Sequence, residues 1–194
     1  MIPDEGYIKF NYTWIEEELS DENIISELNS WRQKLYNSQL IGAYPDGIGY
    51  GNISCRLADG NFLITGTATG GIEKLTNGHF SRVSDFNFVD NAITCHGPVK
   101  ASSESLTHAI IYQSLPKTNA VVHIHNRNLW HKLLNKVPAT SRHVAYGTPE
   151  MAKEIERLLA TTSLQEDKIL VMAGHEDGII TFGDNLAEAA DKLL

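Results

Sequence analysis

Apolar residues recur along the chain with two different spacings, which together predict a mixed α/β fold. From Ser20 to about Gln39 the spacing is that of one face of a helix, and the apolar positions are Ile24, Leu28, Trp31 and Leu35. We expect Ser20 to cap this helix, because Asp21-Glu22 in the following turn complements the positive end of the helix dipole.

Further helices are indicated where capping residues precede apolar runs. Ser102-Ser103-Glu104 opens one such helix, and Thr148-Pro149 opens another that extends to about Leu159. Two shorter helices are expected at Asn128–Leu134 and Leu186–Leu194.

Between these helices, short runs rich in β-branched and aromatic residues predict strands. In chain order they are Ile53–Leu57, Asn61–Thr65, Phe86–Asp90, Ala92–Cys95, Asn119–Asn126, Lys168–Met172 and Ile179–Phe182, and the first four form two hairpins. Small residues predict loops at Ala43–Gly51 and Thr65–Gly71. The simplest account is one α/β domain over residues 1–194, with a mixed or antiparallel sheet covered by helices.

Composition narrows the class of protein without identifying it. The 194 residues are 42% hydrophobic and 21% charged, as in a globular domain, and the net charge of −8 disfavours nucleic acid and anionic membranes as partners. Cys55 and Cys95 lack metal or redox spacing and fit a reducing compartment. Residues 1–10 lack the features of a signal peptide and no apolar run reaches membrane length, so we expect a cytoplasmic protein.

The segment Asn119–Asn126, NAVVHIHN, carries the strongest chemical signal. Side chains at i and i+2 of a strand share a face, so His123 and His125 are expected side by side, with Ile124 turned away. Neutral imidazole suits zinc and its first-row neighbours. The pair indicates part of a metal site; the alternative is two histidines with purely structural roles.

A metal site on this strand needs a third ligand from elsewhere. His175, in the turn GHEDG, is the best candidate, with Glu176 and Asp177 as competing oxygen ligands. On spacing alone, an incidental histidine in a surface turn is the alternative. The remaining histidines are interpreted as surface or core residues; they are His79, His96, His108, His131 and His143. Of these, His96 is kept as a reserve candidate for the metal site, because it lies near Glu104 in the sequence.

Three turns of small residues are candidates for binding an anion: Gly51-Asn52, Thr65–Gly70 and Ser102-Ser103. Glycines let backbone N–H groups approach an anion, and a helix start offers free N–H groups and a favourable dipole. Each turn alone is equally compatible with an ordinary turn or cap. Glu104 is either a surface residue that complements the dipole or, if it lies beside the histidine pair, a metal ligand or general acid/base.

The segments GNIS, FLITGTATGGIEKLT, ASSE, NAVVHIHN, YGTPEMA and GHEDGII occur in this order, which resembles the class II aldolase/adducin family over roughly Trp31 to Leu194. The resemblance implies a single-domain α/β/α layered fold with a central, mainly antiparallel sheet. It also implies a homotetramer with active sites at subunit interfaces.

The resemblance further implies which residues form the site. Zinc or another divalent first-row ion would be bound by His123, His125 and His175, with Glu104 as an additional ligand and acid/base. The positions that match the family's phosphate-binding turns are Gly51, Asn52, Thr69, Gly70, Ser102 and Ser103.

The function implied is that of a metal-dependent, aldolase-type lyase acting on a small phosphorylated ketose through a metal-stabilised enediolate. A sugar-phosphate dehydratase or 4-epimerase using the same metal site is an alternative, and so is a non-catalytic assembly module similar to the adducin head domain. The segment between His125 and Tyr146 is shorter than in the sugar-phosphate aldolases and lacks the tyrosine that they place there, and GHEDG carries two extra residues. These departures keep the alternatives open.

Overall fold

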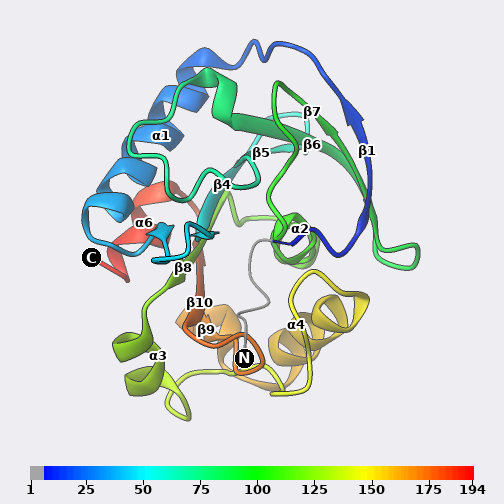
Figure 1. Ribbon diagram of the computed structural model, residues 1–194. Helices are drawn as coiled ribbons and strands as arrows, with labels where there is room; N and C mark the ends of the chain where they lie inside the picture. The colour runs from blue at the N-terminus through cyan, green and yellow to red at the C-terminus, as the bar shows by residue number, and fades with distance from the viewer. Residues whose placement is uncertain (1–6) are drawn as a thin grey trace.

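The computed structural model describes residues 7–194, and an eight-stranded sheet lies at its centre (Figure 1). The strand order is β1-β7-β6-β5-β4-β8-β10-β9. All neighbouring pairs are antiparallel except β1 with β7, so the mainly antiparallel sheet expected from the resemblance is confirmed. The strands are β1 Asn11–Ile15, β4 Asn52–Arg56, β5 Phe62–Thr65, β6 Phe80–Asn87, β7 Ala92–His96, β8 Ala120–His125, β9 Ile169–Val171 and β10 Gly178–Gly183.

Helices cover both faces of this sheet, which gives three layers (Figure 1). On one face α1 (Glu22–Asn37) packs against α6 (Leu186–Asp191), and on the other α2 (Ser105–Ser114) packs against α4 (Pro149–Thr161). The smaller elements are β2 Gly42–Ala43, β3 Gly49–Tyr50, the 3-10 turn Asn77–His79, α3 Arg127–Leu133 and α5 Leu164–Asp167. Among residues 7–194, no helix combines the length and the apolar character needed to cross a bilayer. The expectation about a signal peptide at residues 1–10 lies largely outside the described residues.

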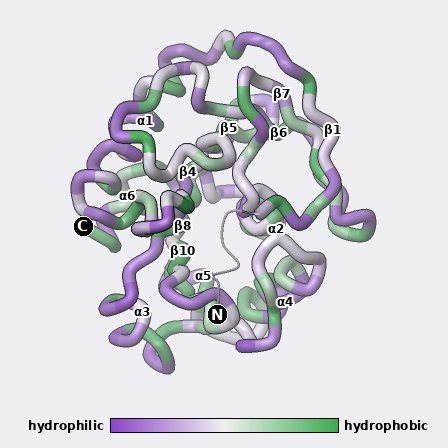
Figure 2. The backbone as a smooth tube through the Cα atoms, viewed as in Figure 1, coloured by the Kyte–Doolittle hydropathy of each residue, from purple (hydrophilic) through white to green (hydrophobic). Residues whose placement is uncertain are grey.

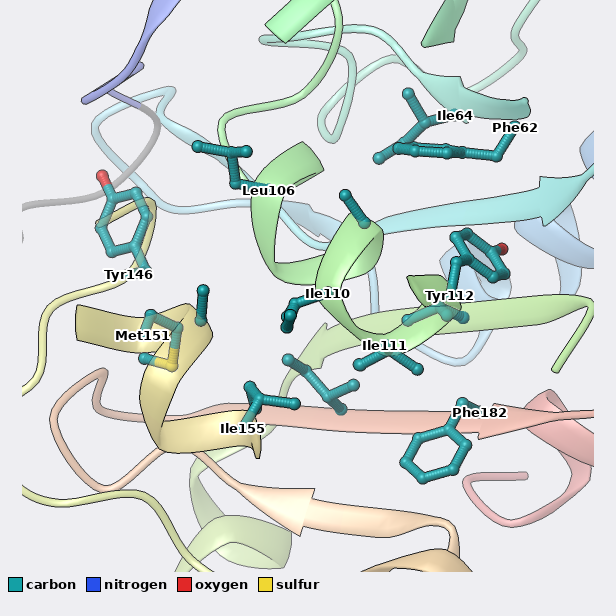
Figure 3. Close-up of a cluster of buried hydrophobic side chains, with 14 of the residues drawn as sticks. Phe62, Ile64, Leu106, Ile110, Ile111, Tyr112, Tyr146, Met151, Ile155 and Phe182 are labelled. Atoms are coloured by element: carbon teal, nitrogen blue, oxygen red, sulfur yellow. The ribbon is translucent and has the colours of Figure 1, made fainter. Parts of the chain in front are cut away.

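Alternation along β8 divides its side chains between two hydrophobic clusters. Ala120, Val122 and Ile124 belong to the cluster under α1 and α6, whereas Val121 belongs to the cluster under α2 and α4. In Figure 3, Ile110 and Ile111 of α2 lie among side chains of the sheet and of α4 in this second cluster. His123 and His125 have the parity of Val121, so they face α2. Figure 2 shows β10 as hydrophobic over much of its length and the outer loops as largely hydrophilic.

The structure corrects the sequence prediction at the first helix. The N-cap is Asp21 instead of Ser20, and its side chain makes no capping hydrogen bond. The buried positions are Ile25, Leu28, Arg32 and Leu35, whereas Ile24 is 37% exposed. The helix is therefore rotated relative to its apolar pattern, because the buried Arg32 side chain hydrogen-bonds backbone carbonyls beneath it.

Two strands also differ from the prediction. β6 begins at Phe80 and ends at Asn87, so Phe86–Asp90 was placed too late. The reason is that Asn87 Oδ1 accepts hydrogen bonds from the N–H groups of Val89 and Asp90, which turns the chain there. β1 was not expected, because this edge strand has mostly exposed side chains and therefore no clear hydrophobic alternation.

Candidate metal centre

Three histidine side chains converge on the face of the sheet that α2 covers. β8 supplies His123 and His125, and the turn between β9 and β10 supplies His175. The Nε2 atoms of His123 and His125 are 3.0 Å apart, and those of His125 and His175 are 3.1 Å apart. The structure therefore brings together the three histidines that the sequence singled out.

Gly178, the first residue of β10, allows the close approach of these rings. A Cβ at this position would lie 2.7 Å from Cδ2 of His175 and 3.2 Å from Cε1 of His123. The N–H of Gly178 donates to the carbonyl of His175, which closes the turn. A side chain at position 178 would therefore push the rings of His123 and His175 apart.

The protonation of the three rings suits a divalent cation. Burial lowers the pKa of His123 to about 4 and holds the pKa values of His125 and His175 well below the ordinary 6.5. A neutral Nε2 carries either one proton or one lone pair, so Nε2 of His125 cannot make good hydrogen bonds to both neighbouring rings. A cation at their common centre would instead receive a lone pair from each ring, which is the donor set of a three-histidine zinc site.

Glu104 extends this group of donors at the start of α2. Its Oε1 lies 3.9 Å from Nε2 of His175, is buried, and has no hydrogen-bond partner among the described residues. Its Oε2 accepts a 2.7 Å hydrogen bond from the hydroxyl of Thr107. Burial raises the pKa of Glu104 to about 7, against the Thr107 hydrogen bond and the charge of Lys9, which lower it. A carboxyl group with this pKa can give or accept a proton at neutral pH.

Three tyrosines surround the histidines and were not identified from the sequence. The hydroxyl of Tyr44 lies 2.7 Å from Nδ1 of His125, and the Tyr50 ring stacks on His125 with centroids 5.4 Å apart. The Tyr146 ring lies 4.6 Å from that of His175. Tyr44 and Tyr50 come from the segment predicted as the loop Ala43–Gly51, in which no spacing pointed toward β8.

The other polar candidates have different roles. His108 is a core residue, as expected: its Nδ1 lies 2.7 Å from the hydroxyl of Ser54. His96 is hydrogen-bonded to Glu17 and Ser84 and lies outside the histidine group, so it is not a candidate ligand in this arrangement. Glu176 pairs with Arg127 at the surface, at 3.1 Å, and is not a competing ligand in this arrangement; nor does Asp177 join the group.

The three small-residue turns meet in one pocket, which we call the three-turn pocket. It is lined by Gly49, Gly51, Asn52, Gly66, Thr67, Ala68, Thr69, Gly70, Ser102 and Ser103. None of these ten lining residues carries a charged side chain. Asn52 pairs with His123 across β4 and β8, and Ser103 precedes Glu104, so the pocket adjoins the histidine group.

The layered fold, the buried histidine triad and the adjoining pocket define an α/β/α domain with a candidate metal centre. The sequence profile described as "Class II Aldolase and Adducin N-terminal domain" matches residues 46–194. The chain belongs to this family, as its motifs indicated.

Individual relatives are distant. The chain is 27% identical over 164 residues to a 3-oxo-tetronate 4-phosphate decarboxylase of Haemophilus influenzae, covering 74% of this chain and 71% of that protein. The fold of the present chain is similar to that of YgbL from Escherichia coli, with a TM-score of 0.65 and 21% identity. The match covers 89% of this chain and 84% of YgbL. The fold is also similar to that of L-fuculose-1-phosphate aldolase from Thermus thermophilus, with a TM-score of 0.61, 21% identity, and coverage of 86% and 85%. At these identities the two structures support the fold alone.

Proposed function

We propose that the protein is a divalent-metal-dependent lyase that cleaves a carbon–carbon bond in a small phosphorylated carbonyl compound. The observation that carries this proposal is the position of Glu104. Its buried Oε1 lies 3.9 Å from Nε2 of His175, and the residue follows Ser103, which lines the three-turn pocket. Such a reaction needs an acid/base, a set of metal ligands and a pocket that binds an anion. Here a buried carboxyl group lies beside candidates for the other two.

Zinc or another first-row divalent ion would be held by His123, His125 and His175, with Glu104 as an additional ligand in the absence of substrate. Such an ion, when bound, would supply Lewis-acid chemistry, which favours negative charge developing next to a substrate carbonyl. The donor set favours zinc, because neutral imidazole nitrogens are among its preferred ligands.

The chain's own residues bind the substrate and move its proton. Backbone N–H groups and hydroxyls of the three-turn pocket bind the phosphate. Ser102 and Ser103 directly precede the N-cap of α2, so the favourable end of a helix dipole lies beside them. Glu104 then shuttles a proton at the reacting carbon or its hydroxyl, because its pKa near 7 makes both protonation states accessible.

Aldol-type cleavage of a ketose phosphate is the leading reaction, as the family resemblance implies. Decarboxylation of a phosphorylated keto acid is a second candidate, favoured by the name of the Haemophilus influenzae relative. A dehydratase or 4-epimerase would use the same residues. A non-catalytic adducin-like module is less consistent with this chain, because it has no need for three ligands and a buried carboxylate in one place.

Metal content and product analysis test the proposal. Elemental analysis of the purified protein should find one divalent ion per chain, and His123→Ala should lose it. The loaded protein is then incubated with fuculose 1-phosphate, rhamnulose 1-phosphate and 3-oxo-tetronate 4-phosphate, and products are followed by NMR. Aldehyde and ketone fragments identify an aldolase, and carbon dioxide release identifies a decarboxylase. A protein that takes up no zinc would contradict the proposal and favour an assembly module.

Three further expectations accompany this function: a single domain over residues 1–194, a homotetramer and a cytoplasmic location. Light scattering on the purified protein tests the tetramer. A monomer with full activity would exclude an active site shared between subunits.

A further inference from the structure

Arg32 is a buried arginine that lies behind the three-turn pocket. It projects from α1 and is 1% exposed. Its Nη2 donates to the carbonyls of Thr69, at 3.1 Å, and Gly70, at 2.8 Å, and its Nη1 donates to the carbonyl of Glu73, at 3.1 Å. The Tyr36 ring lies 4.5 Å from the guanidinium carbon. One side chain thus holds the backbone that forms one wall of the pocket.

These hydrogen bonds, together with the one that the Ile72 N–H donates to the Thr69 carbonyl at 3.1 Å, fix the direction of the peptide groups in that wall. The C=O and N–H of a trans peptide point in opposite directions. Because the carbonyls of Thr69 and Gly70 point to Arg32, the N–H groups of Gly70 and Gly71 point away from it. The Gly70 nitrogen lies 3.2 Å from where a Cβ of Gly49 would be, and both glycines line the pocket. Arg32 therefore helps to keep the carbonyls of Thr69 and Gly70 on its own side of the wall, which leaves the N–H groups of Gly70 and Gly71 on the side of Gly49.

Arg32 also supplies a positive charge that the pocket lining lacks. The ten lining residues are uncharged, so a bound dianion would meet only neutral donors there. Burial lowers the pKa of Arg32 to about 10, which leaves the guanidinium protonated at neutral pH. A charge buried in protein is screened less by solvent than an exposed one, so it favours an anion on the other side of the wall.

We propose that Arg32 is a positioning residue for phosphate binding: it orients the Thr69–Gly71 peptide groups toward the substrate phosphate and places a positive charge behind them. This inference rests on the proposed function, because it assumes that the three-turn pocket binds the phosphate of the substrate. Arg32 touches the pocket wall and not the substrate, so its effect is on affinity for the phosphate group.

Arg56 offers a matched control. Its Nε donates to the carbonyl of Thr118, and its Nη2 donates to those of Tyr112 and Leu115, at 2.8, 2.7 and 3.2 Å. The Tyr112 ring lies 4.8 Å from its guanidinium carbon. Arg56 therefore makes the same kinds of contact as Arg32, but its three acceptor carbonyls belong to residues that do not line the three-turn pocket.

The test is calorimetric titration of zinc-loaded protein with inorganic phosphate. Arg32→Gln is expected to raise the Kd for phosphate at least tenfold, whereas Arg56→Gln should leave it within twofold while lowering the melting temperature. Arg32→Lys keeps the charge but carries its donors on a single nitrogen, so it cannot reproduce the contacts that Arg32 makes through Nη1 and Nη2. It should raise the Kd at least threefold, and it serves as the test if the glutamine variant fails to fold. With an active substrate, the loss should appear in KM and not in kcat.

The outcomes separate this inference from the proposed function. Wild-type binding of phosphate with an unchanged Kd in any folded Arg32 variant would overturn the role of Arg32 alone. A wild-type protein that does not bind phosphate at millimolar concentration would overturn both the role of Arg32 and the phosphate-binding part of the proposed function. A loss of melting temperature in an Arg32 variant without a change in Kd would show a role in folding only.

Discussion

The phenolic oxygen of Tyr44 lies 2.7 Å from Nδ1 of His125, so Nε2 is the ring nitrogen that faces His123 and His175. Hydrogen bonds of this kind fix the tautomer and the orientation of a metal-binding imidazole. Tyr44 lies next to β2 and is 81 residues from His125 in sequence. The β2–β3 segment is therefore part of the candidate metal centre.

Replacing Tyr44 with phenylalanine should weaken zinc binding about 10- to 100-fold, the usual effect of removing a hydrogen bond that orients a metal-binding imidazole. Competition with a chromophoric chelator measures the affinity. Tyr12→Phe is the control, because the Tyr12 hydroxyl contacts Lys100 and not the histidines. Equal zinc affinity in the Tyr44 and Tyr12 variants would contradict this role.

Glu104→Gln should leave one metal ion bound per chain but reduce turnover about 100-fold or more, the scale of a positioned acid/base. The three imidazoles remain to bind the ion, whereas the amide cannot move a proton. Metal analysis and steady-state kinetics on the same preparation separate the two effects, and His123→Ala should lose both metal and activity. Full turnover in the glutamine variant would exclude Glu104 as the acid/base.

Thr107→Val should raise the pKa of Glu104 above about 7, because the hydroxyl of Thr107 hydrogen-bonds the carboxylate and stabilises its charged form. The limb of the kcat–pH profile that reports Glu104 should move to higher pH. Thr181→Val is the matched control, since it removes a buried hydroxyl bonded to the Ala189 carbonyl on the opposite face of the sheet. An identical pH profile in both variants would argue against the assignment.

The metal-free protein should lose stability as the pH falls from about 6.5 to about 4. Burial holds the pKa of His123 at about 4 and those of His108, His125 and His175 well below 6.5. The unfolded chain therefore binds more protons than the folded chain across this window, and the free energy of unfolding falls with the pH. Glu104 acts with the opposite sign. Its raised pKa contributes stability below about pH 4.5 that is lost as the pH rises through about 7.

Four imidazoles outweigh one carboxyl group in this balance. Urea denaturation of chelator-treated protein at several pH values measures the free energy of unfolding directly. The same titration on Glu104→Gln should give a profile that differs mainly between about pH 4.5 and 7, where Glu104 changes its protonation. A free energy of unfolding that does not change between pH 4 and 6.5 would mean that the imidazoles are not buried as described.

The sequence predicted the convergence of the three histidines to the extent that strand periodicity determines their geometry. Alternation in β8 put His123 and His125 on one face, and the order of motifs indicated the turn that carries His175. The three small-residue turns were identified one by one, but only the topology, with β4 beside β8 and α2 over them, explains why they meet.

The sequence did not predict the residues that act through tertiary contacts. Arg32 was overlooked because a charged residue on an amphipathic helix is normally assigned to the solvent face, and here the carbonyls of Thr69, Gly70 and Glu73 replace water as its acceptors. Tyr44 lay in a segment that was interpreted only as a loop. Both depend on backbone groups or rings far away in the chain, which local pattern cannot specify.

The position of β8 between β4 and β10 has a consequence for how an ion can enter and leave. All six residues of β8 are buried, and the strand is paired along both edges, so its amide protons should exchange with solvent only when the whole sheet opens. Two of the three candidate ligands therefore stay in place whether or not an ion is present. Chelation and reloading can then proceed on an intact scaffold, with adjustment left to the His175 turn and the segment that carries Tyr44.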